Sequence, residues 1–223
     1  MYVPAHFAMT AEQVRDVLAS APAGDLVTSG PDGGPEATYL PMLLDPDASG
    51  LGSLIGHLSR VNDQWRRAAG EALFIVHGPD HYIKATWLSR PGAPSVPTWN
   101  YVTVHAYGEL VVHDDHDWVA AAVQRLSAAH GDAGSVPLPE ARIDRMLRAV
   151  VGVELRLTRV VGKAKMSQNK APEVIGQVIE GLRETGDGAV SDWMSAHSLP
   201  RAQAKAELLV GLRKAQQGSS IRS

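Results

Sequence analysis

The sequence contains no cysteine and only two phenylalanines among its 223 residues. The lack of cysteine excludes disulfide bonds, thiolate nucleophiles and cysteine-ligated metals, so any redox chemistry has to come from a bound cofactor. No stretch approaches the roughly 18 apolar residues of a membrane span, and the N-terminus lacks the pattern of a signal peptide. We therefore expect a cytoplasmic protein with no membrane contact.

Neither sign of charge dominates the sequence. It contains 21 basic and 24 acidic residues, which give a formal net charge of −3. We therefore expect no direct binding to DNA. The motifs G-x-G-x-x-G, G-x-x-x-x-G-K-[ST], G-x-S-x-G and H-E-x-x-H are also missing from the sequence. Their absence argues against a Rossmann domain, a P-loop NTPase, a serine hydrolase and a zinc protease.

Hydrophobic residues make up 44% of the chain, enough for a sizeable core, and their spacing is mostly that of strands. Alternation between turn residues predicts strands at 25–29, 36–44, 51–58, 71–77, 82–88, 98–113 and from 153 toward 165. Helical spacing predicts helices at 10–21, 59–69, 118–130, 139–150 and from 172 onward. Thr10 and Gln13 have the spacing of a capping box at the start of the first helix. This order predicts a mainly antiparallel α+β protein, a β-barrel with flanking helices and a helical C-terminal tail.

The long strand predicted at 98–113 has two chemically different faces. One face is apolar, with Val102, Val104, Ala106, Leu110 and Val112; the other is aromatic and hydrogen-bonding, with Trp99, Tyr101, Thr103, His105, Tyr107 and Glu109. The apolar face belongs to the core. The aromatic face fits either the wall of a planar-ligand pocket or a dimer interface, and both roles can hold together.

Two pairs of histidines have a spacing that metal sites use. His77 and His81 flank Gly-Pro-Asp, which favours a β-turn between two strands over a metal site. His113 and His116 lie among aspartates that suit a helix N-terminus. We predict no metal site.

Two polar segments have the side chains that a phosphate needs. Residues 162–170 bring together three lysines, a serine and two amides, and Ser59-Arg60 lies where a strand gives way to a predicted helix. Taken alone, the pattern at 162–170 favours a solvated basic turn, and Ser59-Arg60 is explained as well by a helix cap as by a phosphate site.

Several segments, in the same order along the chain, resemble the PaiB family. They include Met-Tyr-Val-Pro-Ala-His-Phe at 1–7, Gly-His-Leu-Ser-Arg at 56–60, Val-Pro-Thr-Trp-Asn-Tyr at 96–101 and Lys-Met-Ser-Gln-Asn at 165–169. The resemblance covers about residues 1 to 185. It implies an FMN-binding split barrel, similar to pyridoxamine phosphate oxidases and flavin reductases, that works as a homodimer with flavin sites built from both subunits. We expect this domain to span residues 1–170, with residues 171–223 as a helical extension on the barrel or on the dimer partner.

The resemblance also implies roles for individual residues. Ser59 and Arg60 match the segment that takes the FMN phosphate, but Val61 stands where that segment has a lysine. Lys163, Lys165 or Lys84 would then supply the missing charge. The expected cofactor-binding residues are Thr38, Ser59, Arg60, Trp99, Asn100, Tyr101, Lys163, Lys165, Gln168 and Asn169.

Two departures from the family pattern lie in expected pocket walls. Tyr39 stands where a histidine is expected, and Lys84-Ala85-Thr86 stands where Ser-Pro-Ser is expected before Trp87. Each departure is compatible with a different ligand, a different substrate or a site that has drifted.

Three functions remain open. The first is a flavin-dependent oxidoreductase acting on a small organic molecule, with NAD(P)H as electron donor and His105, Tyr101, Tyr39 or His57 as candidate catalytic residues. The second is a non-catalytic flavin-binding regulator of transcription that acts through a partner, or through Arg142, Arg145, Arg148 and the basic tail. The third is a haem-binding split barrel with His57, His77 or His105 as axial ligand.

Overall fold

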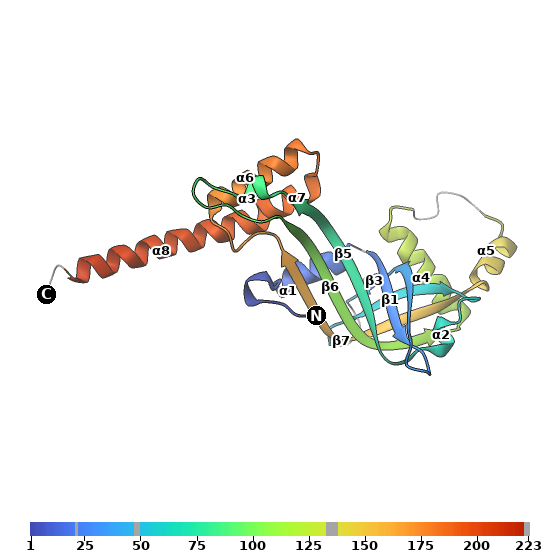
Figure 1. The fold of residues 1–223 in the computed structure, drawn as a ribbon. Coiled ribbons are helices and arrows are strands. Elements are labelled where there is room, and N and C mark those ends of the chain that lie inside the picture. The colour runs from blue at the N-terminus through green and yellow to red at the C-terminus, as the bar shows by residue number, and fades with distance from the viewer. Residues whose placement is uncertain (21, 47–49, 133–137, 221–223) are drawn as a thin grey trace. The chain divides into compact units, whose positions relative to one another are not determined.

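The protein was analysed as a computed structural model, which describes residues 1–20, 22–46, 50–132 and 138–220, with side chains through residue 213. Its described strands form one sheet in the order β2-β1-β5-β6-β7-β4-β3 (Figure 1). The strands are β1 (Ala23–Ser29), β2 (Pro35–Pro41), β3 (Leu43–Asp45), β4 (Ser53–Ser59), β5 (Ala69–Ile83), β6 (Thr98–His113) and β7 (Val150–Lys165). Strand β1 pairs antiparallel with β2 and β5, and β4 pairs antiparallel with β3 and β7. The predicted antiparallel architecture is confirmed.

Helices precede, interrupt and follow the strands. They are η1 (Ala5–Phe7), α1 (Ala11–Ala19), α2 (Gln64–Arg67), α3 (Ala85–Leu88), α4 (His116–Ala129), α5 (Glu140–Leu147), α6 (Pro172–Glu184), α7 (Gly188–Trp193), η2 (Met194–Ser198) and α8 (Leu199–Ser220). None of the described helices is both long enough and apolar enough to span a bilayer.

Strand β6 has the two predicted faces over most of its length, but Val112, which the pattern places in the core, is 36% exposed near the end of the strand. From Asn100 to Gly108, every even-numbered residue is buried, and the odd-numbered residues between them are partly exposed. Asn100 therefore belongs to the buried row. The row of Tyr101, Thr103, His105 and Tyr107 remains partly accessible.

The predicted pair of strands at 71–77 and 82–88, joined by a β-turn at His77–His81, is wrong. The structure has one continuous strand, β5, over this turn-rich sequence, and Ala85–Leu88 is helical. Gly78 has a packing role here, because a Cβ at this position would lie 2.9 Å from the Cβ of Val102. The predicted helix at 59–69 is also shorter than expected, covering only Gln64–Arg67.

The chain divides into two compact units. The first comprises Met1, Met9–His77 and Thr103–Gly162, and the second comprises Tyr2–Ala8, Gly78–Val102 and Lys163–Ser223. The boundary predicted between residues 170 and 171 is a different division and stays a prediction.

The first unit is built around a core of apolar side chains from its strands and α1. This core contains Leu18, Leu26, Leu40, Met42, Leu54, Leu58, Phe74, Val104, Val153 and Leu155. Helix α1 begins at a capping box, in which the Thr10 side chain accepts from the Gln13 amide and the Gln13 side chain accepts from the Thr10 amide. The capping box predicted from the sequence is confirmed, and it fixes where α1 starts above the sheet.

The second unit has its own core around α6. The buried face of that helix consists of Val174, Ile175, Val178, Ile179 and Leu182. The Trp87 ring of α3 lies against Gly181 so closely that a Cβ there would be 2.4 Å from a ring carbon. Helix α8 contacts α6 and η2 and then continues beyond them (Figure 1).

Candidate functional site

The predicted site residues fall into two groups, one in each unit. The second unit holds Trp99, Asn100 and Tyr101 at the start of β6, Lys163 and Lys165 at the end of β7, and Gln168 and Asn169 just after it. The first unit holds Thr38, Tyr39, His57, Ser59, Arg60 and His105.

In the second unit, Lys165 joins the end of β7 to the start of β6. Its Nζ donates to Thr98 Oγ1 and to the Trp99 carbonyl oxygen, both at 2.5 Å. Burial lowers the pKa of Lys165, and the nearby charge of Lys163 lowers it further. Burial and the charge of Lys163 both destabilise the charged form of Lys165. An anion beside Lys165 would stabilise that form, so this position favours an anionic ligand.

Tyr101 lies beside both of these lysines. The Nζ atoms of Lys163 and Lys165 are 5.2 and 5.9 Å from the centroid of the Tyr101 ring. In the described part of the chain, neither lysine pairs with a carboxylate, and neither does Lys170. The result is a cluster of positive charge next to a phenol.

Asn100 is engaged within the protein. Its side chain is buried at 1% exposure, accepts a hydrogen bond from Ser167 Oγ at 3.1 Å, and donates to Met194 Sδ at 3.4 Å. Ser167 has a φ of 58°, in the left-handed region that residues other than glycine seldom adopt. The Asn100 bond therefore stabilises an unusual backbone turn immediately after β7.

Gln168 supports the same turn. Its side-chain amide donates to the Ala164 carbonyl at 2.5 Å and accepts from the Met166 amide at 2.7 Å. Asn169, one residue further on, is exposed. Of the two amides expected to contact the flavin, Asn169 is thus the one whose side chain is accessible.

A cavity of about 200 Å³ opens at this turn. Its polar lining consists of Ser95, Thr98, Asn100, Lys165, Ser167, Asn169 and Lys170, and its apolar lining includes Phe7, Leu88 and Pro97. Lysines, hydroxyls and an amide are a donor set suited to the phosphate of FMN. Since small-molecule sites usually measure roughly 300 to 1,000 Å³, this cavity fits only part of that cofactor.

Arg60, in the first unit, is bound on several sides. Its Nη2 lies 2.5 Å from Asp114 Oδ1 and donates to the Val150 carbonyl at 3.0 Å, while its Nε donates to the Arg148 carbonyl at 2.9 Å. The hydrogen bond from Arg60 lowers the pKa of Asp114, as expected for an ion pair. A phosphate at Arg60 would have to compete with Asp114.

Strands β2 and β4 carry three further predicted residues. Thr38 Oγ1 accepts a hydrogen bond from Asn62 Nδ2 at 2.9 Å, and Tyr39 is 68% exposed. Burial lowers the pKa of His57, and its Nδ1 has no hydrogen-bond partner among the described residues. His57 is therefore a neutral imidazole near pH 7.

His105 lies on the accessible row of β6. Its Nδ1 is 3.4 Å from the Tyr107 hydroxyl, and the Tyr107 ring lies 3.6 Å below the Arg159 guanidinium. Burial is the main cause that lowers the pKa of His105, followed by the charges of the N-terminal amine and of His77. His105 is therefore also neutral near pH 7.

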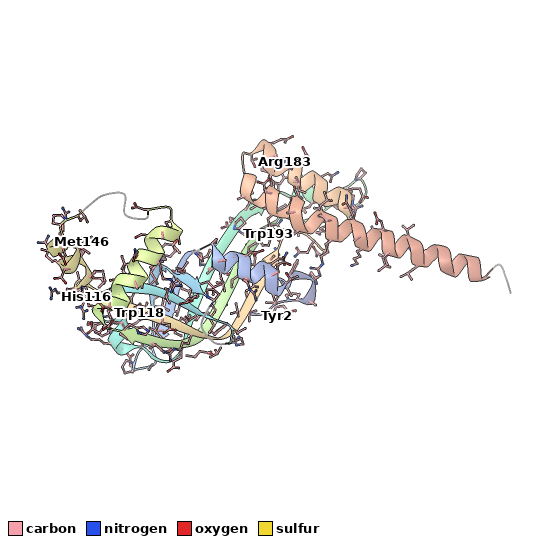
Figure 2. The ribbon with its side chains drawn as sticks, turned by 180° about the vertical axis from the view of Figure 1, so that it is seen from behind. Tyr2, His116, Trp118, Met146, Arg183 and Trp193 are labelled. Carbon is pink, nitrogen blue, oxygen red and sulfur yellow. The ribbon has the colours of Figure 1, made fainter. Side chains whose placement is uncertain are left out.

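The histidines considered as metal ligands each contact carboxylates. His77 lies 3.1 Å from Asp25 and His81 lies 2.7 Å from Asp187. His113 lies 2.9 Å from Glu154 and stacks on Trp118, whereas His116 links α4 to Asp144 of α5 at 3.2 Å; Figure 2 labels His116 and Trp118. Across the described ranges, no three ligand-type side chains converge on one point.

Lys84, the third lysine considered for the phosphate, lies elsewhere in the second unit. Its Nζ is 5.0 Å from the centroid of the Trp87 ring. The expected cofactor contacts did not include Thr98 and Lys170, which both line the cavity, although Lys170 belongs to the polar segment 162–170 noted in the sequence. Thr98 lies on the same face of β6 as Asn100, so the alternation along the strand could have identified it as a lining residue.

The sheet and the cationic turn define the class of the protein, a flavin-binding split barrel, and comparisons with known proteins agree. Residues 1–159 match the family model described as "Putative FMN-binding domain". The chain is 30% identical over 190 residues to "Protease synthase and sporulation protein PAI 2" of Bacillus subtilis, covering 82% of this chain and 89% of that protein. It therefore belongs to the PaiB family of FMN-binding proteins, and FMN is its cofactor.

Solved structures share the fold at low sequence identity. The conserved hypothetical protein Rv2991 of Mycobacterium tuberculosis has a TM-score of 0.55 at 15% identity, over 76% of this chain and 94% of that one. The flavocytochrome Anf3 of Azotobacter vinelandii has a TM-score of 0.54 at 14% identity, over 70% of this chain and 67% of that one. The split-barrel fold predicted from the resemblance is confirmed.

Proposed function

We propose that this protein is an FMN-dependent oxidoreductase that acts on a small organic molecule and takes electrons from NAD(P)H. The observation that carries the proposal is the pair of lysines beside Tyr101, at 5.2 and 5.9 Å from its ring, with no carboxylate partner in the described part of the chain. Such a pair holds an anionic cofactor, and a phenol next to it is a proton donor.

The residues of the chain have separate tasks in this proposal. When bound, FMN would supply hydride transfer from NAD(P)H to the organic acceptor. Lys163 and Lys165 bind the phosphate, and Asn169 and Lys170 close the accessible side of the cavity. Tyr101 donates the proton that balances the charge on the reduced acceptor.

A second copy of the chain completes the site in this proposal. The cavity of about 200 Å³ is too small for the whole cofactor, so the flavin ring needs a further surface to cover it. Sedimentation equilibrium with and without FMN tests this. We expect a dimer whose dissociation releases flavin, and a monomer that retains FMN would contradict it.

The visible spectrum of the purified protein tests the function itself. We expect flavin absorbance that NAD(P)H bleaches under nitrogen and that an organic acceptor restores. Colourless protein that takes up no added FMN would overturn the proposal, as would bound flavin that neither NADH nor NADPH reduces. A Soret band would instead show a haem protein.

The role of Tyr101 can be separated from flavin binding. Tyr101→Phe should retain FMN and its reduction by NAD(P)H, but should slow transfer to the acceptor by about a hundredfold. Tyr82→Phe is the matched control. The centroids of the Tyr82 and Trp99 rings are 6.0 Å apart, and Tyr82 has no role in the proposed reaction. If both variants transfer electrons at the normal rate, Tyr101 is not the proton donor.

A regulator is the second candidate, and α5 is the feature that favours it. Arg142 and Arg145 are exposed on this helix and form no ion pair with any described residue. Arg148 is paired with Asp144. The regulator is supported if the protein retains promoter DNA at physiological salt and the double variant Arg142→Gln/Arg145→Gln does not. If the natural protein retains no DNA, only the oxidoreductase proposal remains.

A further inference from the structure

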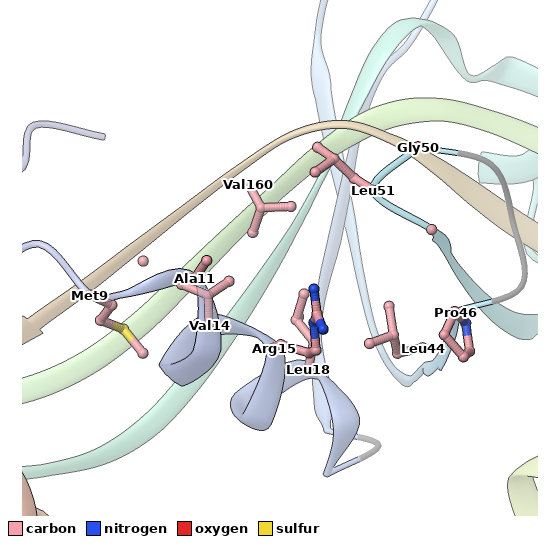
Figure 3. Close-up of a pocket in the computed structure, with 12 residues that line it drawn as sticks. Met9, Ala11, Val14, Arg15, Leu18, Leu44, Pro46, Gly50, Leu51 and Val160 are labelled. Atoms are coloured by element: carbon pink, nitrogen blue, oxygen red, sulfur yellow. The ribbon is translucent and has the colours of Figure 1, made fainter.

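A larger cavity lies in the first unit, and none of its described lining residues is assigned to the flavin. It measures about 540 Å³, within the range of small-molecule sites. Its walls come from α1, from described residues at and between β3 and β4 (Leu44, Pro46 and Gly50–Gly52), and from β7 (Figure 3). Its apolar lining includes Met9, Val14, Leu18, Leu44, Leu51 and Val160.

The described lining contains a single charged side chain, Arg15 of α1. Figure 3 shows its guanidinium rising from α1 into the space between Val160 and Leu44. The Arg15 side chain makes no hydrogen bond or ion pair with any residue that the structure describes. A guanidinium that stays charged at all ordinary pH values is thus available to an incoming anion.

No carboxylate of the described residues lines this cavity. Glu12 and Asp16 are close to Arg15 in sequence but are not part of the lining, and Asp45 at the end of β3 binds Arg125 at 2.9 Å. The positive charge of Arg15 is therefore not neutralised from within the cavity. An anionic ligand would find one binding partner for its charge and an apolar surface for the rest of its body.

The lining also argues against a second flavin. Its described residues include no aromatic ring for stacking and no amide or hydroxyl side chain for the polar edge of a ring. Apart from Arg15, the described side chains are aliphatic or, at Met9, a thioether, which suit a flexible hydrocarbon.

We infer that this cavity binds an aliphatic monocarboxylate, with the carboxylate on the Arg15 guanidinium and the hydrocarbon chain along α1 and β7. The carboxylate and guanidinium form a bidentate, charge-assisted pair. Burial of the hydrocarbon against Val14, Leu44 and Val160 supplies the apolar part of the affinity.

Titration calorimetry of the FMN-loaded protein with dodecanoate, below its micelle concentration, tests the inference. We expect one ligand per chain, and binding weakened about tenfold or more in Arg15→Gln. Arg142→Gln, which removes an exposed arginine outside the cavity, is the matched control and should bind like the natural sequence. Dodecanol should bind the natural protein and Arg15→Gln equally, because it lacks the charge.

A second variant tests the cavity without removing charge. Ala11 is an exposed lining residue at the start of α1, so Ala11→Trp should fill the cavity and reduce dodecanoate binding while the thermal midpoint stays close to normal. The inference is overturned if the natural protein binds no dodecanoate, if it binds several per chain, or if Arg15→Gln binds as tightly as Arg142→Gln.

Discussion

The two places where this chain could hold a phosphate differ in what already surrounds their positive charge. Arg60 bonds to Asp114 and to two backbone carbonyls, whereas Lys163 and Lys165 have no carboxylate partner among the described residues. A charged side chain that is paired within the protein contributes to the stability of the fold. A charged side chain without a partner of opposite charge is available to a ligand. We therefore expect the phosphate at the lysines and a structural role for Arg60.

Removal of both lysine charges should have the largest effect. Lys163→Met/Lys165→Met should weaken FMN binding by about a hundredfold, because two charge-assisted contacts to the phosphate are lost. Quenching of flavin fluorescence measures the dissociation constant. Lys205→Met, on the exposed part of α8, is the control; equal affinity in the two proteins would contradict the assignment.

Removal of the Asn100 side chain should affect the fold first. Asn100→Ala leaves the buried Ser167 hydroxyl without its acceptor, which should lower the free energy of unfolding by about 1 to 3 kcal/mol. Denaturant unfolding of the flavin-free protein measures this. If stability is unchanged and only FMN is lost, Asn100 contacts the cofactor and does not support the turn.

Replacement of Arg60 should change flavin affinity less than replacement of the lysines. Arg60→Met should alter the FMN dissociation constant by less than about threefold and lower the thermal midpoint, since three contacts are lost. Asp114→Asn is the matched variant, because it releases Arg60 without removing it. If Asp114→Asn tightens FMN binding and Arg60→Met abolishes it, the phosphate lies at Arg60, as the family resemblance implied.

Replacement of His57 should have the smallest effect on stability, and only at acidic pH. Its pKa is lowered in the folded protein, so below about pH 6.5 the unfolded chain binds the extra proton and stability falls as the pH falls. His57→Gln should therefore lose less of its thermal midpoint between about pH 7.5 and pH 5.5 than the natural protein does. Identical losses in both proteins would show that His57 does not cause the acid sensitivity.

Local patterns in the sequence predicted the local structure well. The capping box of Thr10 and Gln13 predicted where α1 begins, and the alternation along 98–113 predicted all of β6. The turn residues at 77–81 misled, because Gly78 is required for close approach to Val102, a contact that only the folded sheet creates.

The candidate site was harder to predict because its contacts join distant parts of the chain. Asn100 is 94 residues from Met194, and Arg60 is 54 residues from Asp114. The sequence shows that these side chains are polar, but it does not show whether they already have hydrogen-bond or ion-pair partners within the protein. That difference separates a ligand contact from a structural one, and it became visible only in three dimensions.

The contact of Trp87 with Gly181 has a consequence for how this family can vary. Lys84, Ala85 and Thr86 depart from the family pattern while the tryptophan after them is retained, and its ring occupies the space where a side chain at 181 would lie. Positions 87 and 181 should therefore evolve as a pair. An alignment of relatives would show alanine or a larger residue at 181 only where position 87 has a side chain smaller than tryptophan.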